Sequence, residues 1–277
     1  MKKIIPFILF FLSYITPQAQ WFTEPIIELD TAKLQVLYKL TFIDDTNHMN
    51  YTKTEEQILV LGVSASSYES YNHYKYQKTG RKKAQEGNLM EWLQTGISAT
   101  EYMCSFYYQI YKFYRNNSII YTERIFGLDY FKYEENNDIF TWEMGQDTDT
   151  ILGFICQNAF CNYGGRRWEA WFTSDINFSD GPYKFCGLPG LILKICDTKE
   201  HYKFEVLSIE IPCKNTLVEY HDRDFICTTK KDFFKVYDDN NKNMTNIILE
   251  NSGDASVAQR ASQYVSSQNN PLELDRK

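Results

Sequence analysis

The sequence predicts an all-β protein with a minor α-helical part, built as one large curved antiparallel sheet or half-barrel. Aromatic residues make up 16% of the 277 residues, among them 21 tyrosines and 19 phenylalanines. Such side chains favour the pleated, half-buried surface of a sheet. Short alternating segments separated by polar turns also recur along the chain. One or two short helices interrupt them, which is typical of a sheet that curves around a core.

The first half of the chain begins with two strands. Residues 33–42 carry apolar side chains at every second position, with Leu37 as the only exception, and this alternation predicts an amphipathic strand. Residues 55–63 are predicted to form the next strand. Apolar side chains three to four positions apart then predict a short helix over residues 88–97, and residues 139–142 are predicted to form another short strand.

Two hairpins are marked by their turn residues. Residues 106–124 contain two aromatic and β-branched arms about Asn116-Asn117, residues that tolerate positive φ. Residues 151–175 form the clearer hairpin, because two consecutive glycines at Gly164-Gly165 suit a type I′ turn. Pairing outward from that turn predicts the cross-strand neighbours Cys161–Trp168, Ala159–Ala170 and Gln157–Phe172.

The second hairpin has large aromatic side chains on both faces. Trp168 and Phe172 point to one face and Trp171 to the other, because side chains alternate along a strand. One face is expected to join the core. The other is expected to lie under a helix or second layer, or to line a ligand cavity. Trp168, Trp171 and Phe172 are therefore candidate ligand-facing residues.

A glycine- and proline-rich hexapeptide follows this hairpin. It reads Gly187, Leu188, Pro189, Gly190, Leu191 and Ile192, preceded by the pair Gly181 and Pro182. Proline followed by glycine predicts a type II turn, which needs positive φ at Gly190. A strand over residues 191–196 then enters the core and pairs with residues 202–211. No lysine followed by serine or threonine comes next, so a phosphate-binding loop is not predicted.

These residues carry a resemblance to a known family. The hexapeptide, the Gly181-Pro182 pair and the approach GRRWEAWFTSDI are similar to the GLPGLI family of exported Bacteroidetes proteins, and the resemblance covers about residues 34–211. The biochemical role of that family is not established. The resemblance implies a curved sheet or half-barrel similar to LolA-like lipoprotein-carrier folds, an analogy that does not fix a function.

The N-terminal residues predict export. Residues 1–19 begin with two lysines and continue with an apolar run that is too short to span a bilayer, as in a cleaved signal peptide. Residues 20–250 are then expected to form a single domain, and residues 251–277 a polar C-terminal tail. The mature protein is predicted to be periplasmic or secreted and not to span a membrane.

Seven cysteines remain after the predicted cleavage. In an oxidising compartment they can form up to three disulfides with one thiol left over, while buried free thiols are the alternative. No CxxC pair is present, which argues against a redox motif or a zinc ribbon. The candidate disulfide cysteines are Cys104, Cys156, Cys161, Cys186, Cys196, Cys213 and Cys227.

Two charged stretches are expected to be solvated surface segments without a binding or catalytic role. Residues 68–83 mix tyrosines with lysines and an arginine. They are expected to form a strand end and a solvated loop, with contact to anionic lipid headgroups or glycans as the alternative. Residues 221–224 read His-Asp-Arg-Asp and are expected to form a solvated turn rather than a catalytic base with its orienting partner.

The composition and the absence of motifs narrow the function. A net charge of −7 and a pI near 5.2 argue against nucleic acid as a partner. No catalytic, cofactor or metal motif is found among the four histidines. We therefore expect a non-enzymatic binding or assembly protein, with a lipid, an apolar peptide or an envelope protein as partner. Two alternatives remain open, an accessory protein of an outer-membrane transporter and a hydrolase whose carboxylates meet only in the fold.

Overall fold

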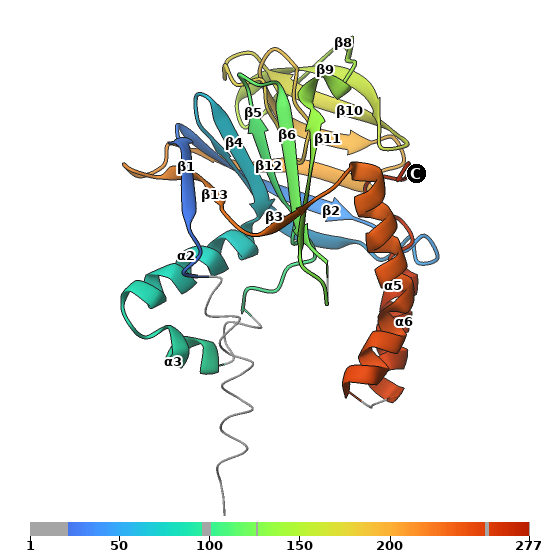
Figure 1. The fold of residues 1–277 in the computed structure, drawn as a ribbon. Coiled ribbons are helices and arrows are strands. Elements are labelled where there is room, and N and C mark those ends of the chain that lie inside the picture. The colour runs from blue at the N-terminus through green and yellow to red at the C-terminus, as the bar shows by residue number, and fades with distance from the viewer. Residues whose placement is uncertain (1–21, 96–100, 126, 253–254, 277) are drawn as a thin grey trace, which may run out of the picture.

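The structure is a computed structural model that describes residues 22–95, 101–125, 127–252 and 255–276. The predicted signal peptide, residues 1–19, lies outside the described residues. Within them, strands dominate, and most belong to one large open sheet (Figure 1). The prediction of an all-β protein with a curved open sheet is confirmed.

The large sheet contains twelve strands and has two free edges among the described residues, β14 and β8. All neighbours are antiparallel except the short pair β14–β7. The spatial order is β14 (Phe225–Cys227), β7 (Tyr130–Asn136), β6 (Ser118–Arg124), β5 (Gln109–Phe113), β4 (Ala65–Ser70), β3 (Lys53–Leu61), β2 (Leu34–Phe42), β12 (Tyr202–Glu210), β11 (Leu191–Asp197), β10 (Arg166–Thr173), β9 (Phe154–Tyr163) and β8 (Glu143–Ile151).

A second, two-stranded sheet lies outside the large one. It pairs β1 (Ile26–Thr31) with β13 (Leu217–His221). Together with helix α2 (Tyr71–Gln85), it covers the outer face of β2 and β3, where a small second core forms around Ile58, Val60 and Val218. Leu37, the exception in the alternation of its strand, packs against this outer core. Both faces of the sheet are therefore covered in this region.

The predicted hairpins are confirmed. Strands β9 and β10 pair Cys161 with Trp168, as the sequence predicts, and the two pairs further from the turn are also the predicted ones. Gly164 and Gly165 have φ of 61° and 71°, the conformation of a type I′ turn. Strands β5 and β6 also pair as predicted, and Asn117 in their turn has φ of 56°.

The helices depart from the prediction. Helix α3 (Leu89–Gln94) lies where a helix is predicted, but the residues expected to form a loop before it are helical in α2. Their charges are paired, since Lys78 and Arg81 both contact Glu219 of β13, at 2.6 and 2.7 Å. Residues 139–142 form no strand, because a 3₁₀ turn, η1 (Asn137–Ile139), occupies the start of that segment.

The C-terminal part contributes two further helices, α5 (Lys230–Ser252) and α6 (Ala255–Ser267), which lie side by side next to the sheet (Figure 1). The Thr229 hydroxyl accepts a hydrogen bond from the Asp232 backbone N–H at 3.1 Å, which caps the start of α5. Phe233 in its first turn is fully buried against β7. The sequence predicts no helix at α5, and α6 lies within the residues expected to form a polar tail.

The hexapeptide forms a tighter turn than predicted. The Gly190 N–H donates to the Leu188 carbonyl at 2.8 Å, which closes a three-residue turn about Pro189 and replaces the predicted type II turn. Positive φ at Gly190 is confirmed, at 147°. A Cβ on this residue would lie 2.0 Å from the Thr173 carbonyl oxygen. The close approach of the two backbone segments therefore requires glycine in this turn.

A fully buried ion pair holds the loop that leads to this turn. The Lys112 ammonium contacts the Asp180 carboxylate, and the hydroxyls of Ser66 and Tyr114 donate to the same carboxylate at 2.6 and 2.7 Å. Lys112 also donates to the Gly181 carbonyl at 2.7 Å. Because every charge here is paired and hydrogen-bonded, the loop is fixed to β4 and β5. The motif residues therefore have a structural role.

The cysteines are free thiols in the structure, so the expected disulfides are not formed. Cys156 lies opposite Asp149, Cys161 opposite Trp168, and Cys196 opposite Lys203 and Glu169. None of these three strand cysteines faces another cysteine across the sheet, which is the physical reason that they do not pair. Burial raises the pKa of the Cys161 thiol to about 12.

Candidate functional site

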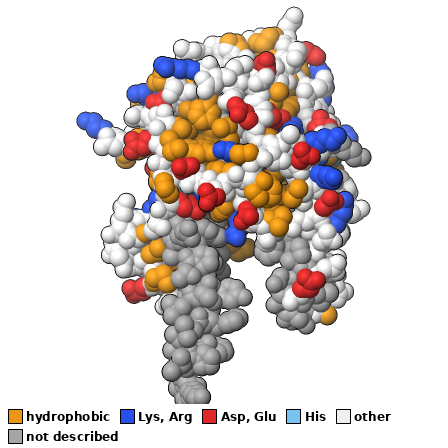
Figure 2. Space-filling model, viewed as in Figure 1, with side chains coloured by type: hydrophobic (Ala, Val, Ile, Leu, Met, Phe, Trp, Pro, Cys, Tyr) orange, Lys and Arg blue, Asp and Glu red, His pale blue; other side chains and the backbone are white. Residues whose placement is uncertain are grey.

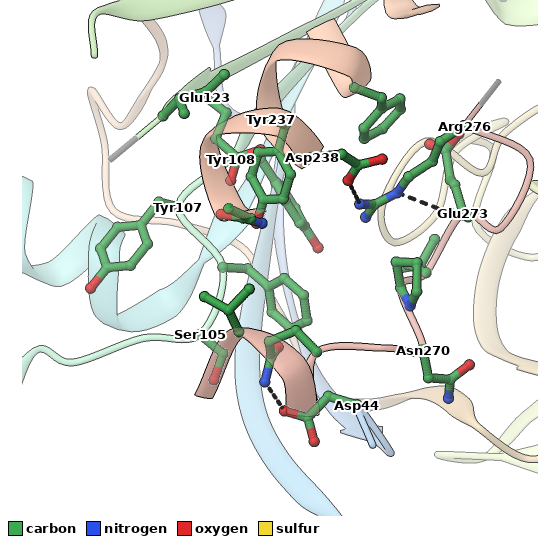
Figure 3. Close-up of a pocket in the computed structure, with 18 of the residues that line it drawn as sticks. Asp44, Ser105, Tyr107, Tyr108, Glu123, Tyr237, Asp238, Asn270, Glu273 and Arg276 are labelled. Carbon is green, nitrogen blue, oxygen red and sulfur yellow. Dashed lines mark hydrogen bonds and ion pairs between the residues drawn. The ribbon is translucent and has the colours of Figure 1, made fainter. Parts of the chain in front are cut away.

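The main candidate site is a pocket of about 430 Å³ between the open end of the large sheet and the helices α5 and α6 (Figure 3). Ten aromatic side chains dominate its lining. The lining residues named in Figure 3 come from the end of β6, from the segments that follow β2 and precede β5, from α5 and from the C-terminal segment, so they converge from distant parts of the chain. The aromatic set is Phe42, Phe106, Tyr107, Tyr108, Tyr121, Tyr183, Tyr202, Phe234, Tyr237 and Tyr264.

Glu123 is the carboxylate that distinguishes this pocket. It lies at the end of β6, where alternation places it on the same face as Tyr121, and it accepts a hydrogen bond from the Tyr121 hydroxyl at 2.6 Å. Burial raises the pKa of the Glu123 carboxyl to about 7, although the Tyr121 hydrogen bond and the charge of Arg276 act in the opposite direction. A carboxyl with such a pKa can exchange a proton near neutral pH.

The other acidic groups that line the pocket have cationic or amide partners. Asp44 accepts from the Lys53 ammonium and the Gln268 amide, at 2.5 and 2.6 Å. Asp238 of α5 pairs with Arg276 at 3.3 Å. No salt bridge between described residues includes Glu123. Its carboxyl therefore differs from these acids in having no ion-pair partner within the described parts of the chain.

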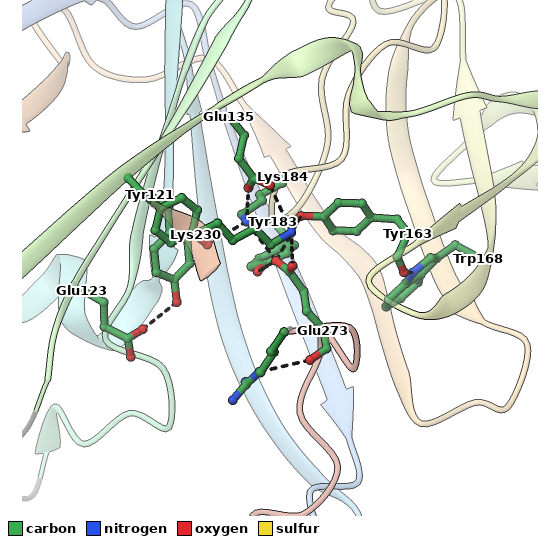
Figure 4. A network of polar contacts seen from close by, with 11 residues as sticks. Tyr121, Glu123, Glu135, Tyr163, Trp168, Tyr183, Lys184, Lys230 and Glu273 are labelled. Carbon is green, nitrogen blue, oxygen red and sulfur yellow. Dashed lines mark hydrogen bonds and ion pairs between the residues drawn. The ribbon is translucent and has the colours of Figure 1, made fainter. Parts of the chain in front are cut away.

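A network of charges and tyrosines forms the floor beneath the pocket (Figure 4). The ammonium of Lys184, whose side chain is fully buried, contacts Glu135 at 2.5 Å and Glu273 at 2.9 Å. Lys230 at the start of α5 contacts the same two carboxylates at 3.0 and 2.6 Å. Four tyrosine rings surround Lys184, with centroids between 4.9 and 5.9 Å from its nitrogen: Tyr121, Tyr133, Tyr163 and Tyr183.

The balance of charge in this network keeps Glu273 ionised. Burial alone would raise the pKa of its carboxyl, but the ammonium groups of Lys184 and Lys230 outweigh burial and hold that pKa at about 2. The Tyr183 hydroxyl also donates to Glu273 at 2.5 Å. Glu273 and Tyr183 belong to the pocket lining as well, so the network directly supports the site.

The C-terminal segment closes the pocket on one side. Arg166 of β10 donates to the Leu272 and Pro271 carbonyls, at 2.9 and 2.7 Å. The Asn270 amide donates to the Ile43 carbonyl after β2 at 2.5 Å. Asn270, Leu272 and Glu273 are buried, so the last part of the predicted polar tail is packed into the domain.

The residues predicted to face a ligand do not line this pocket. Trp168 and Phe172 lie in the main core, and Trp171 packs against it from the other face of the hairpin. The loop after β10 folds back, so the Phe185 ring lies 4.8 Å from Trp168 and fills the space in which a ligand was expected. The face of β10 with Trp168, Ala170 and Phe172 is buried, whereas Arg167 on the other face is exposed and Trp171 is half-buried, so the chain covers only one face of this hairpin fully.

Sequence reasoning did not identify the pocket residues. The signals available were Glu123 on an otherwise apolar strand face and the acid in the closing Pro271-Leu272-Glu273-Leu274. Neither is specific by itself. The segment 221–224 is also misjudged, since His221 is buried and receives a hydrogen bond from Arg81 at 3.0 Å. Burial and the nearby Arg223 and Arg81 lower the pKa of His221, so this imidazole is neutral.

The surface around the site combines apolar and acidic groups. On the face seen in Figure 2, hydrophobic side chains gather over the front strands of the sheet and next to α5, with acidic side chains between them.

In the described parts of the chain, no three histidine, cysteine or acidic side chains are grouped to hold a metal ion. None of the described helices is long and apolar enough to cross a bilayer.

Comparison with known proteins adds one family model. Residues 163–194 match the model described as a protein of unknown function (Porph_ging). The match runs from the end of β9 through the hexapeptide, which is the stretch that carries the GLPGLI resemblance. No curated protein matches the chain.

Comparison with solved structures shows similarity of fold. The chain is similar to PNGF-II solved in space group P21, with a TM-score of 0.54 and 12% identity over 74% of this chain and 33% of that one. For PNGF-II in space group C2 the TM-score is 0.52, with 13% identity over 75% of this chain and 32% of that one. The chain thus spans about a third of these neighbours. At this identity, the likeness concerns the fold alone.

Proposed function

We propose that the protein is a binding protein that holds an apolar or amphipathic ligand, or a segment of another protein, in the pocket between the sheet and α5–α6. The observation that carries this proposal is the aromatic lining of a pocket of about 430 Å³. Ligand sites typically have volumes of about 300–1,000 Å³ and apolar walls with a few polar groups. Aromatic rings supply large contact areas, each worth about 1.5–3 kcal/mol when fully buried.

The wall formed by α5 and α6 supports the same proposal. Tyr237 of α5 and Tyr264 of α6 both line the pocket, and Tyr264 is 59% exposed. An exposed ring at the rim of an apolar pocket is available to cover a bound molecule. The charge network that forms the floor holds the side of the pocket opposite α5 and α6 in place, so a ligand would meet a preformed surface.

The test is titration with Nile red, an uncharged apolar dye whose fluorescence rises in an apolar site. Wild-type protein is expected to bind the dye saturably, and Tyr264→Ala to weaken binding by about tenfold, since one ring contact is lost. Tyr51→Ala is the matched control, because Tyr51 is 65% exposed and does not line the pocket. Equal binding by all three proteins, or no saturable binding, would contradict the proposal.

A second experiment seeks the natural ligand. Native mass spectrometry of protein purified from the host envelope is expected to show bound mass that Tyr264→Ala loses and Tyr51→Ala keeps. Trp168, which lies in the core, and Trp171, which packs against it, do not line the pocket, so their fluorescence is a poor reporter for this site.

Glu123 favours a second candidate function, a hydrolase in which this residue acts as general acid or base. Its pKa of about 7 is in the range that suits proton transfer at neutral pH. Glu123→Gln should then abolish turnover of an ester or glycoside panel while Nile red still binds. Wild-type protein with no turnover across the panel would leave the binding function alone.

A further proposal concerns the place of action, the periplasm or the cell exterior. It is supported by the charged and apolar N-terminal residues of the sequence. Fractionation of the host, with Phe22-containing peptides traced by mass spectrometry, is expected to find the protein outside the cytoplasm.

A further inference from the structure

The Lys184 network shows how this fold accommodates an ammonium group. A buried amine is costly unless carboxylates and aromatic faces replace its water. Lys184 has both, because its nitrogen contacts Glu135 and Glu273 and lies 5.1 Å from the Tyr121 centroid and 5.5 Å from that of Tyr183. Two of its ring partners, Tyr121 and Tyr183, also line the pocket above.

The pocket has a similar combination of a carboxylate and aromatic rings around Glu123. The Tyr121 ring lies over Lys184, and the hydroxyl of the same residue donates to the Glu123 carboxylate. Tyr108 and Tyr237 complete an aromatic surround (Figure 3). Burial raises the pKa of both hydroxyls, and the charge of Glu123 contributes less to the same shift, after that of Glu55 in the case of Tyr108. The Tyr108 hydroxyl is buried and has no hydrogen-bond partner among the described residues.

Several charged and titratable groups lie around Glu123. Arg124, the next residue in β6, also lines the pocket, and its guanidinium lies 5.7 Å from the Tyr130 centroid. Tyr133 of β7 and Tyr121 of β6 are neutral phenols whose pKa is raised by burial. Arg276 of the C-terminal segment is held by Asp238 at 3.3 Å, and its guanidinium stacks 4.6 Å from the Phe234 centroid. Arg276 is thus engaged beside the site, and a carboxylate within an aromatic wall is left to face the pocket.

We infer that the pocket recognises a ligand with a positively charged alkylamine group, which Glu123 pairs with while the surrounding tyrosine rings contact the cation. This inference rests on the proposed binding function and names the chemistry of its ligand. An amphipathic amine and the lysine side chain of a protein segment share that chemistry. A carboxylate ligand would meet the repulsion of Glu123 and is disfavoured.

Ionisation of Glu123 gives the inference a pH signature. Burial holds the pKa of this carboxyl at about 7, so the group is largely ionised at pH 8 and largely protonated at pH 5.5. An alkylammonium keeps its charge over this range, because its pKa is near 10. The preference for an amine should therefore be strong at pH 8 and weak at pH 5.5.

The experiment compares decylamine, decanamide and decanoate, which carry a similar alkyl chain and differ in the head group. Isothermal titration of wild-type protein at pH 8 is expected to show decylamine binding at least about tenfold more tightly than decanamide, the effect of one favourable charge contact. That ratio is expected to fall below about threefold at pH 5.5. The pH series uses the wild-type chain and does not depend on the folding of a variant.

Two variants sharpen the test. Glu123→Gln removes the charge and should reduce the amine-to-amide ratio at pH 8 to near one. Glu86→Gln makes the same change at an exposed carboxylate of the turn after α2, away from the pocket, and should leave the ratio as in wild type. A short synthetic peptide with one lysine, compared with its acetyl-lysine form, separates the protein-segment source from the small amine.

The possible outcomes distinguish a failure of the amine inference from a failure of the proposed binding function. A ratio near one in wild type at pH 8, or a ratio that Glu123→Gln leaves unchanged, overturns the amine inference while ligand binding stands. Failure of all three decyl compounds and Nile red to bind overturns the proposed function together with the inference.

Discussion

At the scale of single residues, the contacts of Glu273 hold the C-terminal segment against the sheet. Its carboxylate forms ion pairs with the ammonium groups of Lys184 and Lys230. It also accepts hydrogen bonds from the hydroxyls of Tyr163 and Tyr183, at 3.0 and 2.5 Å. A buried ion network stabilises a fold only while each charge is balanced, so removal of one member leaves an uncompensated charge. The protonation state of this residue is therefore linked to stability.

The first prediction concerns pH. The pKa of Glu273 is about 2 in the folded protein and near 4.5 when unfolded. Because the folded value is lower, its contribution to stability is fully present above pH 4.5 and is lost as pH falls from 4.5 towards 2. Glu273→Gln should lower the free energy of unfolding at pH 7, and the free energy of unfolding of this variant should fall less steeply than that of wild type between pH 4.5 and 2. Urea denaturation at pH 2.5, 4.5 and 7 measures both, and parallel curves for the two proteins would refute the assignment.

The second prediction concerns Gly190. Alanine there combines positive φ with a Cβ placed 2.0 Å from the Thr173 carbonyl oxygen, so Gly190→Ala should lower the free energy of unfolding by about 2 kcal/mol or more. Gly153→Ala is the control, since Gly153 has φ of 83° with nothing within 4 Å, and should cost only about 1 kcal/mol. Equal losses of stability in urea would mean that the clash is absent.

At the scale of elements, α2 is fixed to the rest of the molecule by both of its faces. One face carries Lys78 and Arg81, which bind Glu219 of β13. The other carries Gly80, which lies under the ring of Phe22, and Phe22 in turn contacts Tyr76 and Trp92, with centroids 5.1 and 5.8 Å apart. Glycine within a helix lowers its intrinsic stability, so its presence here follows from this contact.

The third prediction uses that contact. A Cβ at Gly80 would lie 2.1 Å from the Phe22 ring, so Gly80→Ala should lower the melting temperature although alanine favours helix. With Phe22→Ala already in place, the same change should raise the melting temperature, because the clash is gone and the helix propensity remains. A double-mutant cycle by thermal unfolding measures the coupling. An additive cycle would show that Phe22 does not pack on Gly80.

At the scale of the molecule, both ends of the described chain pack into the fold. Phe22, the first described residue, is buried between α2 and α3, and the segment from Asn270 to Glu273 is buried beside β10 and β12. The open sheet is thus closed at one end by the C-terminal segment and α5–α6 (Figure 1), and this closure forms the pocket.

The fourth prediction concerns processing of the N-terminus. Cleavage is expected after Ala19, so the mature protein should begin near Gln20 and retain Phe22, whose loss would remove the ring that packs on Tyr76 of α2 and Trp92 of α3. Intact-mass and N-terminal peptide analysis of protein from the host envelope measures the first residue. A mature chain that starts with Met1, or one that starts beyond Phe22, would contradict this expectation.

The sequence by itself determined the local features of this protein. Alternation along β2 predicts the face formed by Val36, Tyr38 and Leu40, all fully buried. Two adjacent glycines predict the register of the β9–β10 hairpin. These features depend on side-chain alternation and on the φ values that a turn requires, and both are properties of neighbouring residues.

Only the tertiary structure decided the site. The pocket depends on contacts such as that between Asp44 and Gln268, which lie 224 positions apart. The pKa of Glu123 depends on burial under α5 and the C-terminal segment, and the exclusion of a ligand from Trp168 depends on the return of Phe185. The burial of a side chain and the pairing of its charge depend on which distant segments of the chain pack together. The local patterns in this sequence do not determine that packing.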